Sequence, residues 1–381
     1  MKEKKSKYVV HYLPFLEIEK PIKLGAVQFF PYPEQTDMIE NSKLIPYFEK
    51  IKNSYWFAKE KPLKSITLVK YLPKPWNQLD DDEQKIVWNT NIFLCFCCLA
   101  TNEFSPDKSY RNSTNFQLIT QYLSLESDFF SVQTRRRWGT SLTGGYKWGE
   151  HIQVIPNYIG TIFETKFDES LISIFNDILE GKFRHYPELN IALEWFYWAN
   201  TDSPFTTLDL EAVLMASAFE ALFKVYPEVG GKRKFLMEAI KHHFNNYKRI
   251  TTTRPYIQGT SEKTRGWKGF WMDEFYWYRN CIAHGTKPDW NGKIWNPLEH
   301  LFIANKIFID SIRVKFEKDR LLKMDIEQLT NIDATDEFIR DGSIFEKDWN
   351  NIFSNQMWET TSSQAKRELP KKKIRAEREG K

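Results

Sequence analysis

Cysteine is scarce in this chain of 381 residues, and its few copies are not spaced as metal ligands. Three of the 4 cysteines, Cys95, Cys97 and Cys98, lie in the apolar run 92–99. A structural zinc site needs four ligands, and neither a second Cys pair nor a nearby His completes the set that Cys95 and Cys98 begin. We therefore predict buried free thiols, no metal ligands and a reducing, cytoplasmic environment.

Long apolar runs are also missing. No segment approaches the ~20 apolar residues that a helix needs to cross a bilayer, so we expect no membrane as a partner. The N-terminus is rich in lysine and continues as a strand pattern, without the apolar core and cleavage site of a signal peptide. The two Gly-Gly pairs lack the Lys and hydroxyl spacing of a phosphate-binding loop. We therefore expect a cytoplasmic protein that uses no cofactor.

Aromatic residues are abundant instead. They form 16% of the chain, with 14 Trp, 17 Tyr and 29 Phe, beside an ordinary hydrophobic fraction of 41%. This excess predicts cores built largely from rings, and exposed rings also offer stacking surfaces for nucleic-acid bases. A chain of this length is long enough for two domains, each with its own core.

Positive charge gathers at the C-terminus. The segment 363–381 holds eight Lys or Arg and three Glu, hence +5, while the whole chain carries +4, so the rest is about −1. Lys371, Lys372 and Lys373 form the densest part of this tail. A disordered basic tail of this kind either contacts RNA phosphates or only keeps the protein in solution.

Residues 1–165 mix strand and helix patterns. Alternating residues predict strands at 8–13 and 65–72. The segment 80–100 opens with acidic residues and becomes apolar, which predicts one long buried helix. Further on, 135–155 predicts a strand, a turn at the Gly-Gly pair and a second strand.

Three consecutive arginines open the segment 135–155. Arg135, Arg136 and Arg137 stand directly before Trp138. Guanidinium groups bind phosphate, and an indole stacks on a base, so the set is a candidate RNA-binding surface. Charged residues are equally typical of a solvated edge strand, and both explanations remain open.

From Phe167 the apolar period becomes helical. The predicted helices cover 168–181, 189–200, 206–225, 232–246, 269–285 and 296–323, with one or two more before 358. Thr206 to Asp209 is typical of a capping box, and 251–268 is a loop long enough to be functional. His242 and His243 point about 100° apart on their helix and cannot chelate one metal well, so we predict surface positions.

The segment Arg279-Asn280-Cys281-Ile282-Ala283-His284, closed by Gly285, carries the strongest chemical signal. Arg neutralises phosphate and His transfers protons near neutral pH, a set that can cleave RNA without a metal. At about 100° per residue, an arc of roughly 140° that begins at Arg279 contains Ala283, Tyr276, Asn280, Asp273 and His284. The opposite side contains Phe275, Ile282, Trp271, Tyr278 and Cys281. The polar groups therefore share one face, and the other face suits a core.

A purely structural explanation of this segment also exists. An imidazolium suits the negative end of a helix dipole, and Gly suits the left-handed cap that follows it. His284 and Gly285 would then form an ordinary helix end. Spacing and face alone leave both explanations open.

The flanking helices make the segment resemble the HEPN superfamily, most closely its ApeA-like branch of bacterial and phage-defence proteins. Arg279, Asn280, His284 and Gly285 fit that family's Arg-x(4–6)-His pattern with a polar residue after the Arg. The stretch 216–222, in which Glu220 sits among small and apolar residues, is similar to the preceding family helix, and 191–199 to the first long one. The resemblance covers roughly 167–325.

This resemblance implies a metal-independent endoribonuclease that acts as a homodimer in anti-phage defence or as a toxin. His284 would transfer protons, Arg279 would stabilise the phosphate and Asn280 would orient it. Glu220 needs a partner if it is buried, and it either orients Arg279 or His284 or pairs with an unrelated cation. The alternative within the family is a module that binds nucleotide or RNA, or dimerises, without cleaving.

The expected fold class is α+β. A mixed α/β domain at 1–165 for recognition or sensing precedes an all-α HEPN-like bundle at 166–325. A helical extension at 326–362 and the basic disordered tail at 363–381 follow. The RNA target, the trigger and any regulatory protein have no signal in the sequence.

Overall fold

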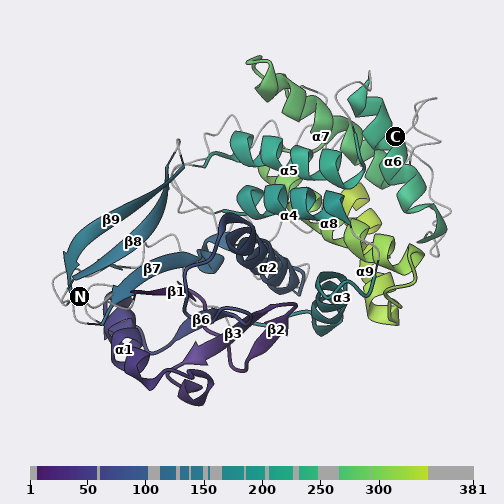
Figure 1. Cartoon of the computed structure of the whole chain (residues 1–381). Helices are drawn as coiled ribbons and strands as arrows, with labels where there is room; N and C mark the ends of the chain where they lie inside the picture. Colours follow the sequence, from purple (N-terminus) through teal and green to yellow (C-terminus); the bar gives the residue numbers. More distant parts are fainter. Residues whose placement is uncertain are drawn as a thin grey trace, which may run out of the picture. The chain divides into compact units, whose positions relative to one another are not determined.

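The computed structural model has the expected α+β fold, with an antiparallel sheet in the N-terminal part and helices after it (Figure 1). The structure describes residues 7–57, 61–101, 112–125, 129–136, 139–148, 153–154, 165–183, 186–201, 206–225, 231–247, 266–291 and 293–341. No helix in this part of the chain combines the length and the apolar character needed to cross a bilayer.

The chain forms two compact units. Of the described residues, the first unit contains those from 7 to 186 together with Asn200 and Thr201, and we call it the sheet unit. The second unit contains 187–199 and those from 206 to 341, and we call it the helical unit. The segment 166–186, which the sequence groups with the helical bundle, belongs here to the sheet unit.

Seven antiparallel strands form the main sheet, in the order β2-β3-β6-β1-β7-β8-β9. They are β1 (Lys7–Leu13), β2 (Ile22–Leu24), β3 (Val27–Tyr32), β6 (Ile66–Tyr71), β7 (Ile119–Ser124), β8 (Phe129–Arg136) and β9 (Gly139–Lys147). A smaller sheet joins β10 (Gln153–Val154), β4 (Tyr55–Phe57) and β5 (Lys61–Pro62). The strands predicted at 8–13 and 65–72 are confirmed as β1 and β6, which pair in register His11 to Val69.

The Gly-Gly turn predicted after the arginines is wrong. Gly144 and Gly145 lie inside β9, where the register to β8 shifts between Phe130 and Ser131. Glycine in a strand interior is typical of such a bulge, because the extra residue needs a backbone that other side chains hinder. The edge of the sheet is β9, so Arg135 and Arg136 lie on the strand next to the edge.

Alternating strand residues build the core of the sheet unit together with α1 (Ile45–Asn53). Val10 and Tyr12 of β1 and Leu68 of β6 point to one side, where Phe48 of α1 packs with them. Phe48 also contacts the indole of Trp76, with ring centroids 5.1 Å apart. The predicted aromatic core is confirmed in this unit.

The predicted buried helix at 80–100 is confirmed as α2 (Asp81–Leu99). Asp80 and Glu83 form a reciprocal capping box, which satisfies two amide groups at its start. Cys95 and Cys97 are buried and in no disulfide, as predicted, whereas Cys98 is half-buried. Burial raises the pKa of Cys98 to about 12, so this thiol stays protonated. α2 contacts α3 (Glu169–Leu179) through stacked rings 4.7 Å apart.

The helical unit consists of α4 to α9 in its described part (Figure 1). Their bounds are α4 (Pro187–Ala199), α5 (Leu208–Leu222), α6 (Lys232–His243), α7 (Trp267–Ala283), α8 (Pro297–Lys318) and α9 (Ile326–Asp341). All correspond to predicted helices, although α7 begins two residues earlier than Gly269. Thr207 caps α5 by accepting from the Leu210 amide, but position N3 is Leu210, so the predicted capping box is only half formed. A full capping box starts α8, between Asn296 and Glu299.

Rings also hold the helical unit together. Phe196 of α4 stacks on Phe308 of α8 with centroids 4.8 Å apart. Phe219 of α5 meets Phe308, Trp271 and Phe275 edge to face. These contacts place α5 between α4, α7 and α8, so a residue on α5 can reach the motif helix.

The surface position predicted for His243 is wrong. His242 is exposed, but the His243 imidazole is half-buried and its Nε2 lies 2.8 Å from the carbonyl oxygen of Ser311 on α8. Burial and the charges of Lys318 and Lys315, against the opposing Ser311 hydrogen bond, lower the pKa of His243 to about 4. His243 is therefore a neutral anchor between α6 and α8.

We expect the helical unit to lose stability as the pH falls from 6.5 towards 4. The unfolded His243 binds a proton near its ordinary pKa of 6.5, whereas the folded one resists protonation down to about 4. The unfolded state therefore binds more protons in this window, which costs up to about 3 kcal/mol. Urea unfolding of His243→Gln across these pH values should show a shallower loss than the wild type. His242→Gln is the control and should keep the wild-type slope; equal slopes for all three proteins would contradict the assignment.

Candidate active site

The motif lies on α7, whose burial follows the predicted division only in part. Trp271, Phe275 and Tyr278 are fully buried, as their side of the helix predicts. Tyr276 is buried too, although the helical period places it on the polar face with Arg279. The guanidinium carbon of Arg279 lies 5.3 Å from the centre of the Tyr276 ring. The polar face of α7 is therefore packed against the unit along most of its length.

The end of α7 has the geometry of a Schellman motif. His284 is the C-cap residue, and Gly285 follows in the left-handed region at φ 65°. The Gly285 amide donates to the carbonyl of Ile282 and the Thr286 amide donates to Cys281. The backbone of His284 and Gly285 thus forms the helix end that the structural explanation predicts, and the His284 side chain remains exposed.

Glu220 on α5 forms the centre of the polar cluster. Its Oε1 lies 3.3 Å from Nη2 of Arg279 and accepts a hydrogen bond of 2.7 Å from the Tyr276 hydroxyl. Its Oε2 accepts from Lys232 Nζ at 2.9 Å, from the first turn of α6. We call Glu220, Arg279, Tyr276 and Lys232 the Glu220 cluster. Of the partners left open for Glu220, the structure shows Arg279, and Lys232 adds a second cation.

The Glu220 cluster is mostly enclosed, and the buried Nε of Arg279 has no hydrogen-bond partner among the described residues. The side chains of Glu220 and Arg279 are 14% and 21% exposed, so their attraction is less screened than on an open surface. Nη1 of Arg279 also donates to the amide oxygen of Asn280. Burial and the hydrogen bond to Glu220 raise the pKa of the Tyr276 hydroxyl, which therefore stays protonated and donates. The arrangement fixes a guanidinium beside an amide on one helix face.

His284 does not join this cluster. No contact links its imidazole to Glu220 or Arg279, all of which are described residues. Five residues along a helix separate two side chains by about 140° and about 7.5 Å of rise. Arg279 and His284 of one chain are thus brought to the same end of α7 but not to one point.

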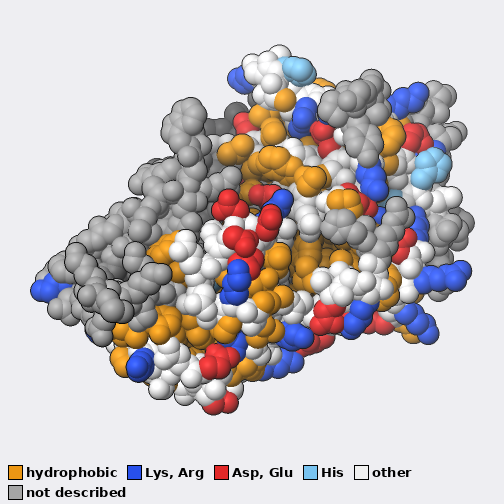
Figure 2. All heavy atoms as spheres, in the orientation of Figure 1, with side chains coloured by type: hydrophobic (Ala, Val, Ile, Leu, Met, Phe, Trp, Pro, Cys, Tyr) orange, Lys and Arg blue, Asp and Glu red, His pale blue; other side chains and the backbone are white. Residues whose placement is uncertain are grey.

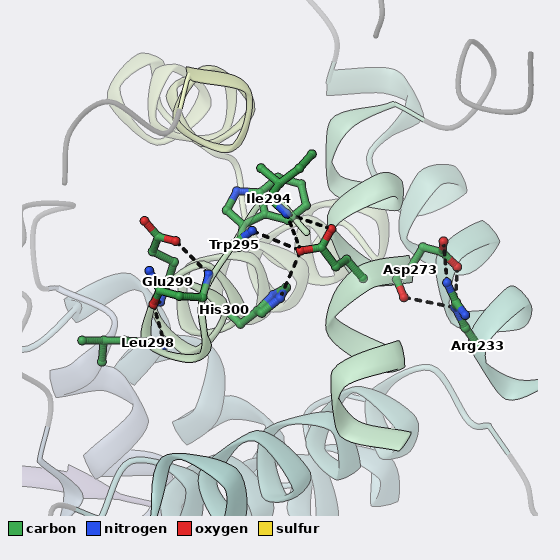
Figure 3. Close-up of polar contacts among 9 residues, drawn as sticks. Arg233, Asp273, Ile294, Trp295, Leu298, Glu299 and His300 are labelled. Atoms are coloured by element: carbon green, nitrogen blue, oxygen red, sulfur yellow. Dashed lines mark hydrogen bonds and ion pairs between the residues drawn. The ribbon is translucent and has the colours of Figure 1, made fainter. Parts of the chain in front are cut away.

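A second set of polar contacts fixes α7 from its other sides (Figure 3). Asp273, which the helical period places near Arg279, pairs instead with Arg233 of α6. The two bonds are 2.7 and 2.9 Å long and bidentate, a geometry that holds the two helices in one register. Beside them, Gly269 of α7 passes close to α6, where an added Cβ would lie 3.4 Å from the Met237 carbonyl oxygen.

Glu274 is buried on α7 and holds the segment that follows the motif. Figure 3 labels its partners Ile294, Trp295 and His300. Its carboxylate accepts from the backbone amides of Ile294 and Trp295, at 2.9 and 3.1 Å to Oε1. The fully buried His300 of α8 lies with Nε2 3.6 Å from the same oxygen. Around the imidazole are the rings of Trp271, Phe275, Tyr278, Trp290 and Trp295. The chain that leaves His284 is thereby returned to α7 and anchored there.

The structure describes only some of the predicted RNA-binding residues. Arg135 and Arg136 belong to β8 in the sheet unit, whereas the Glu220 cluster belongs to the helical unit. Arg137 lies outside the described residues. So do the loop 251–265, the part of the C-terminal extension that follows α9, and the tail residues Lys371, Lys372 and Lys373. Within the described residues, no group of three or more His, Cys, Asp or Glu side chains is arranged to hold a metal ion.

Two members of the Glu220 cluster are absent from the residues predicted from sequence. Tyr276 stands one helical turn before Arg279, a spacing that makes the two side chains neighbours, so its participation had a usable signal. Lys232 had none, because its approach to Glu220 depends on how α6 returns across α5 after Gly231. Glu274 and His300 were missed for the same reason.

Comparison of the chain with models of protein families, with curated proteins and with solved structures gives no match. The resemblance to the HEPN superfamily therefore depends on the residues of the motif and of the helices before it. The geometry of the helical unit is the remaining basis for a functional proposal.

We expect Glu274→Ala to destabilise the helical unit by roughly 2–5 kcal/mol, because the buried amide of Trp295 and the part-buried amide of Ile294 lose their acceptor. Urea unfolding measures this loss. Glu238→Ala on α6 removes a carboxylate that is 37% exposed and pairs only with Lys241 and His242, so it should cost at most about 0.5 kcal/mol. Equal losses in the two variants would contradict the anchoring role of Glu274.

Proposed function

We propose that the helical unit is a metal-independent endoribonuclease of the HEPN type that works as a homodimer. The observation that supports this most is the pairing of Glu220 with Arg279 on the motif helix, at 3.3 Å. A mostly enclosed carboxylate beside the motif guanidinium would hold that group in one orientation, which suits catalysis by this segment. An ordinary helix end needs no such partner.

The residues suit attack of the ribose 2′-hydroxyl on the adjacent phosphate. A new P–O2′ bond forms as the P–O5′ bond breaks, which gives a 2′,3′-cyclic phosphate and a 5′-hydroxyl. Arg279 would stabilise the dianionic transition state, and Asn280 would orient it. His284 would take the 2′-hydroxyl proton, and the exposed position of its imidazole leaves it accessible to RNA. Glu220 is a positioning residue, because it acts through Arg279.

Dimerisation would complete the site. Within one chain, Arg279 and His284 diverge by about 140°, so one copy presents the two groups to different points. A two-fold axis near the end of α7 would bring the Arg279 of each copy towards the His284 of the other and supply a second imidazole to protonate the leaving oxygen. The sheet unit would then choose the RNA or sense a trigger, and the basic tail would add phosphate contacts.

The competing proposal is a module that binds nucleotide or RNA, or dimerises, without cleaving. The complete Schellman motif supports it, because it gives His284 and Gly285 a structural role independent of catalysis. A role in phage defence or as a toxin follows from the family resemblance and belongs to the catalytic proposal. RNA cleavage by the purified protein separates the two.

We expect the purified protein to cleave single-stranded RNA in excess EDTA and to leave 2′,3′-cyclic phosphate and 5′-hydroxyl ends. The substrate's own 2′-hydroxyl is the nucleophile, so DNA and RNA with one 2′-deoxy residue at the cut site should remain intact. His284→Ala and Arg279→Ala should each lower the cleavage rate by a factor of roughly 100 or more. Mass spectrometry of the fragments identifies the ends.

Lys287→Ala is the matched control, since this exposed cation follows the motif and lies outside the proposed site. It should cleave as the wild type does. All variants are first compared by circular dichroism and thermal unfolding. Fragments with 5′-phosphate ends, or folded His284→Ala that cleaves at the wild-type rate, would contradict the proposal.

We expect a homodimer in solution. Light scattering after size exclusion should give twice the chain mass at tens of micromolar. Mixing inactive Arg279→Ala with inactive His284→Ala should restore part of the activity, because each mixed dimer then joins one intact Arg279 to the one remaining His284. The second imidazole is missing, so the restored rate should stay below that of the wild type. A monomer that cleaves at the full rate would contradict this part of the proposal.

A further inference from the structure

An open groove lies between α4 and α5 in the helical unit, next to the Glu220 cluster. Its volume is about 450 Å³, within the range of pockets that bind small organic groups. Ile191 and Trp195 of α4 and Ala221 of α5 form its apolar wall, with Glu188, Glu220 and Lys224 as its charged lining. Glu220 thus belongs both to the groove and to the cluster that holds Arg279.

The apolar wall of the groove is unusually open to solvent. Ile191 and Trp195, one helical turn apart, are 54% and 38% exposed. Trp195 makes no ring contact with any described residue, in contrast to most tryptophans of the helical unit. Figure 2 shows hydrophobic side chains in a band over α5, with acidic and basic side chains beside them over α4. A flat indole left free in this way is a stacking surface.

The charges around the groove favour an anionic ligand. Glu188 is nearly buried and lies 3.5 Å from both Lys224 and Lys315. Burial would raise the pKa of Glu188, but its own backbone amide and the charges of Lys315 and Lys224 outweigh this and lower it. With Lys232 and Arg279 on Glu220, and with Asp319 3.9 Å from Lys315, four cations face three carboxylates, which leaves a net charge of +1.

We infer that the groove binds one unpaired nucleobase of the RNA, beside the phosphate at Arg279. Trp195 stacks on the base, Ile191 and Ala221 enclose it, and Lys224, which lines the groove and is 47% exposed, contacts a neighbouring phosphate. A base must leave a duplex to enter a groove of this kind, so the substrate class is single-stranded RNA. This inference rests on the proposed function, which it deepens.

A second copy of the chain is a less suitable occupant of the groove. An interface between copies is normally depleted of charged residues at its centre. Here Glu188, Glu220 and Lys224 line the same hollow as the apolar wall. An aromatic base matches the apolar wall, and a phosphate beside it matches Lys224.

The test measures binding apart from cleavage. Fluorescence anisotropy follows a labelled short single-stranded RNA on His284→Ala, which the proposed function makes inactive, and on the same protein with Trp195→Ala added. Trp195→Ala should weaken binding roughly tenfold or more, and Trp195→Phe, which keeps a ring, should restore most of the affinity. Phe235→Ala is the matched control, since its ring is 40% exposed on α6 outside the groove. The corresponding duplex should bind weakly to all variants.

Two results would overturn the inference. Trp195→Ala that binds the single strand as tightly as its parent, or no binding by the parent, would exclude a base in the groove. Trp195→Ala that converts a dimer to a monomer in light scattering would make the groove an interface between copies. Wild-type protein that shows the Trp195-dependent binding but cleaves no RNA would refute the proposed function and leave the groove assignment standing.

Discussion

The carboxylate of Glu220 fixes the positions of the Arg279 and Tyr276 side chains on the polar face of α7. It is mostly enclosed, accepts hydrogen bonds from Tyr276 and Lys232, and forms an ion pair with Arg279; these residues come from two further helices. A buried carboxylate without partners is costly, and so is a buried guanidinium, so each group requires the others. Glu220 is on α5 and Arg279 is on α7. The packing of these two helices and the orientation of Arg279 therefore depend on each other. A change in the distance between α5 and α7 would move the guanidinium of Arg279 before it disturbed the packing of the aromatic core.

The aromatic core supplies the rigidity that this constraint needs. Phe219, one residue before Glu220, packs on Trp271 and Phe275 of α7. The same two rings border His300, beside the carboxylate of Glu274. α7 is thus fixed by rings on its apolar side and by the polar contacts of three carboxylates, those of Glu220, Asp273 and Glu274. Such a helix presents its last turn in a defined direction, whichever role His284 has.

Local sequence patterns predicted the helices and strands well, but they could not predict which side chains from distant helices meet in the folded structure. The caps at Asp80 and Asn296 and the apolar periods are local, so α2 and α8 follow from neighbouring residues. The opposing faces of α7 were also predictable, and they made Arg279 a candidate partner for Glu220. Lys232 joins the cluster only because of the path of the chain after Gly231, and His243 is half-buried only because α8 covers it. Adjacent residues there have opposite environments, which no period in the sequence indicates.

Sharing one carboxylate between two cations has a consequence for ligand binding. An Arg held by a single buried Glu would have to leave that Glu uncompensated in order to meet a phosphate, and the lost pairing would oppose binding. Here Lys232 and the Tyr276 hydroxyl stay on Glu220 when Arg279 turns part of its guanidinium to an anion. The carboxylate then keeps its charge compensated, and the Tyr276 ring continues to support the guanidinium from below. The cluster can therefore exchange one contact of Arg279 for a phosphate oxygen at a small cost in free energy, which a simple ion pair could not.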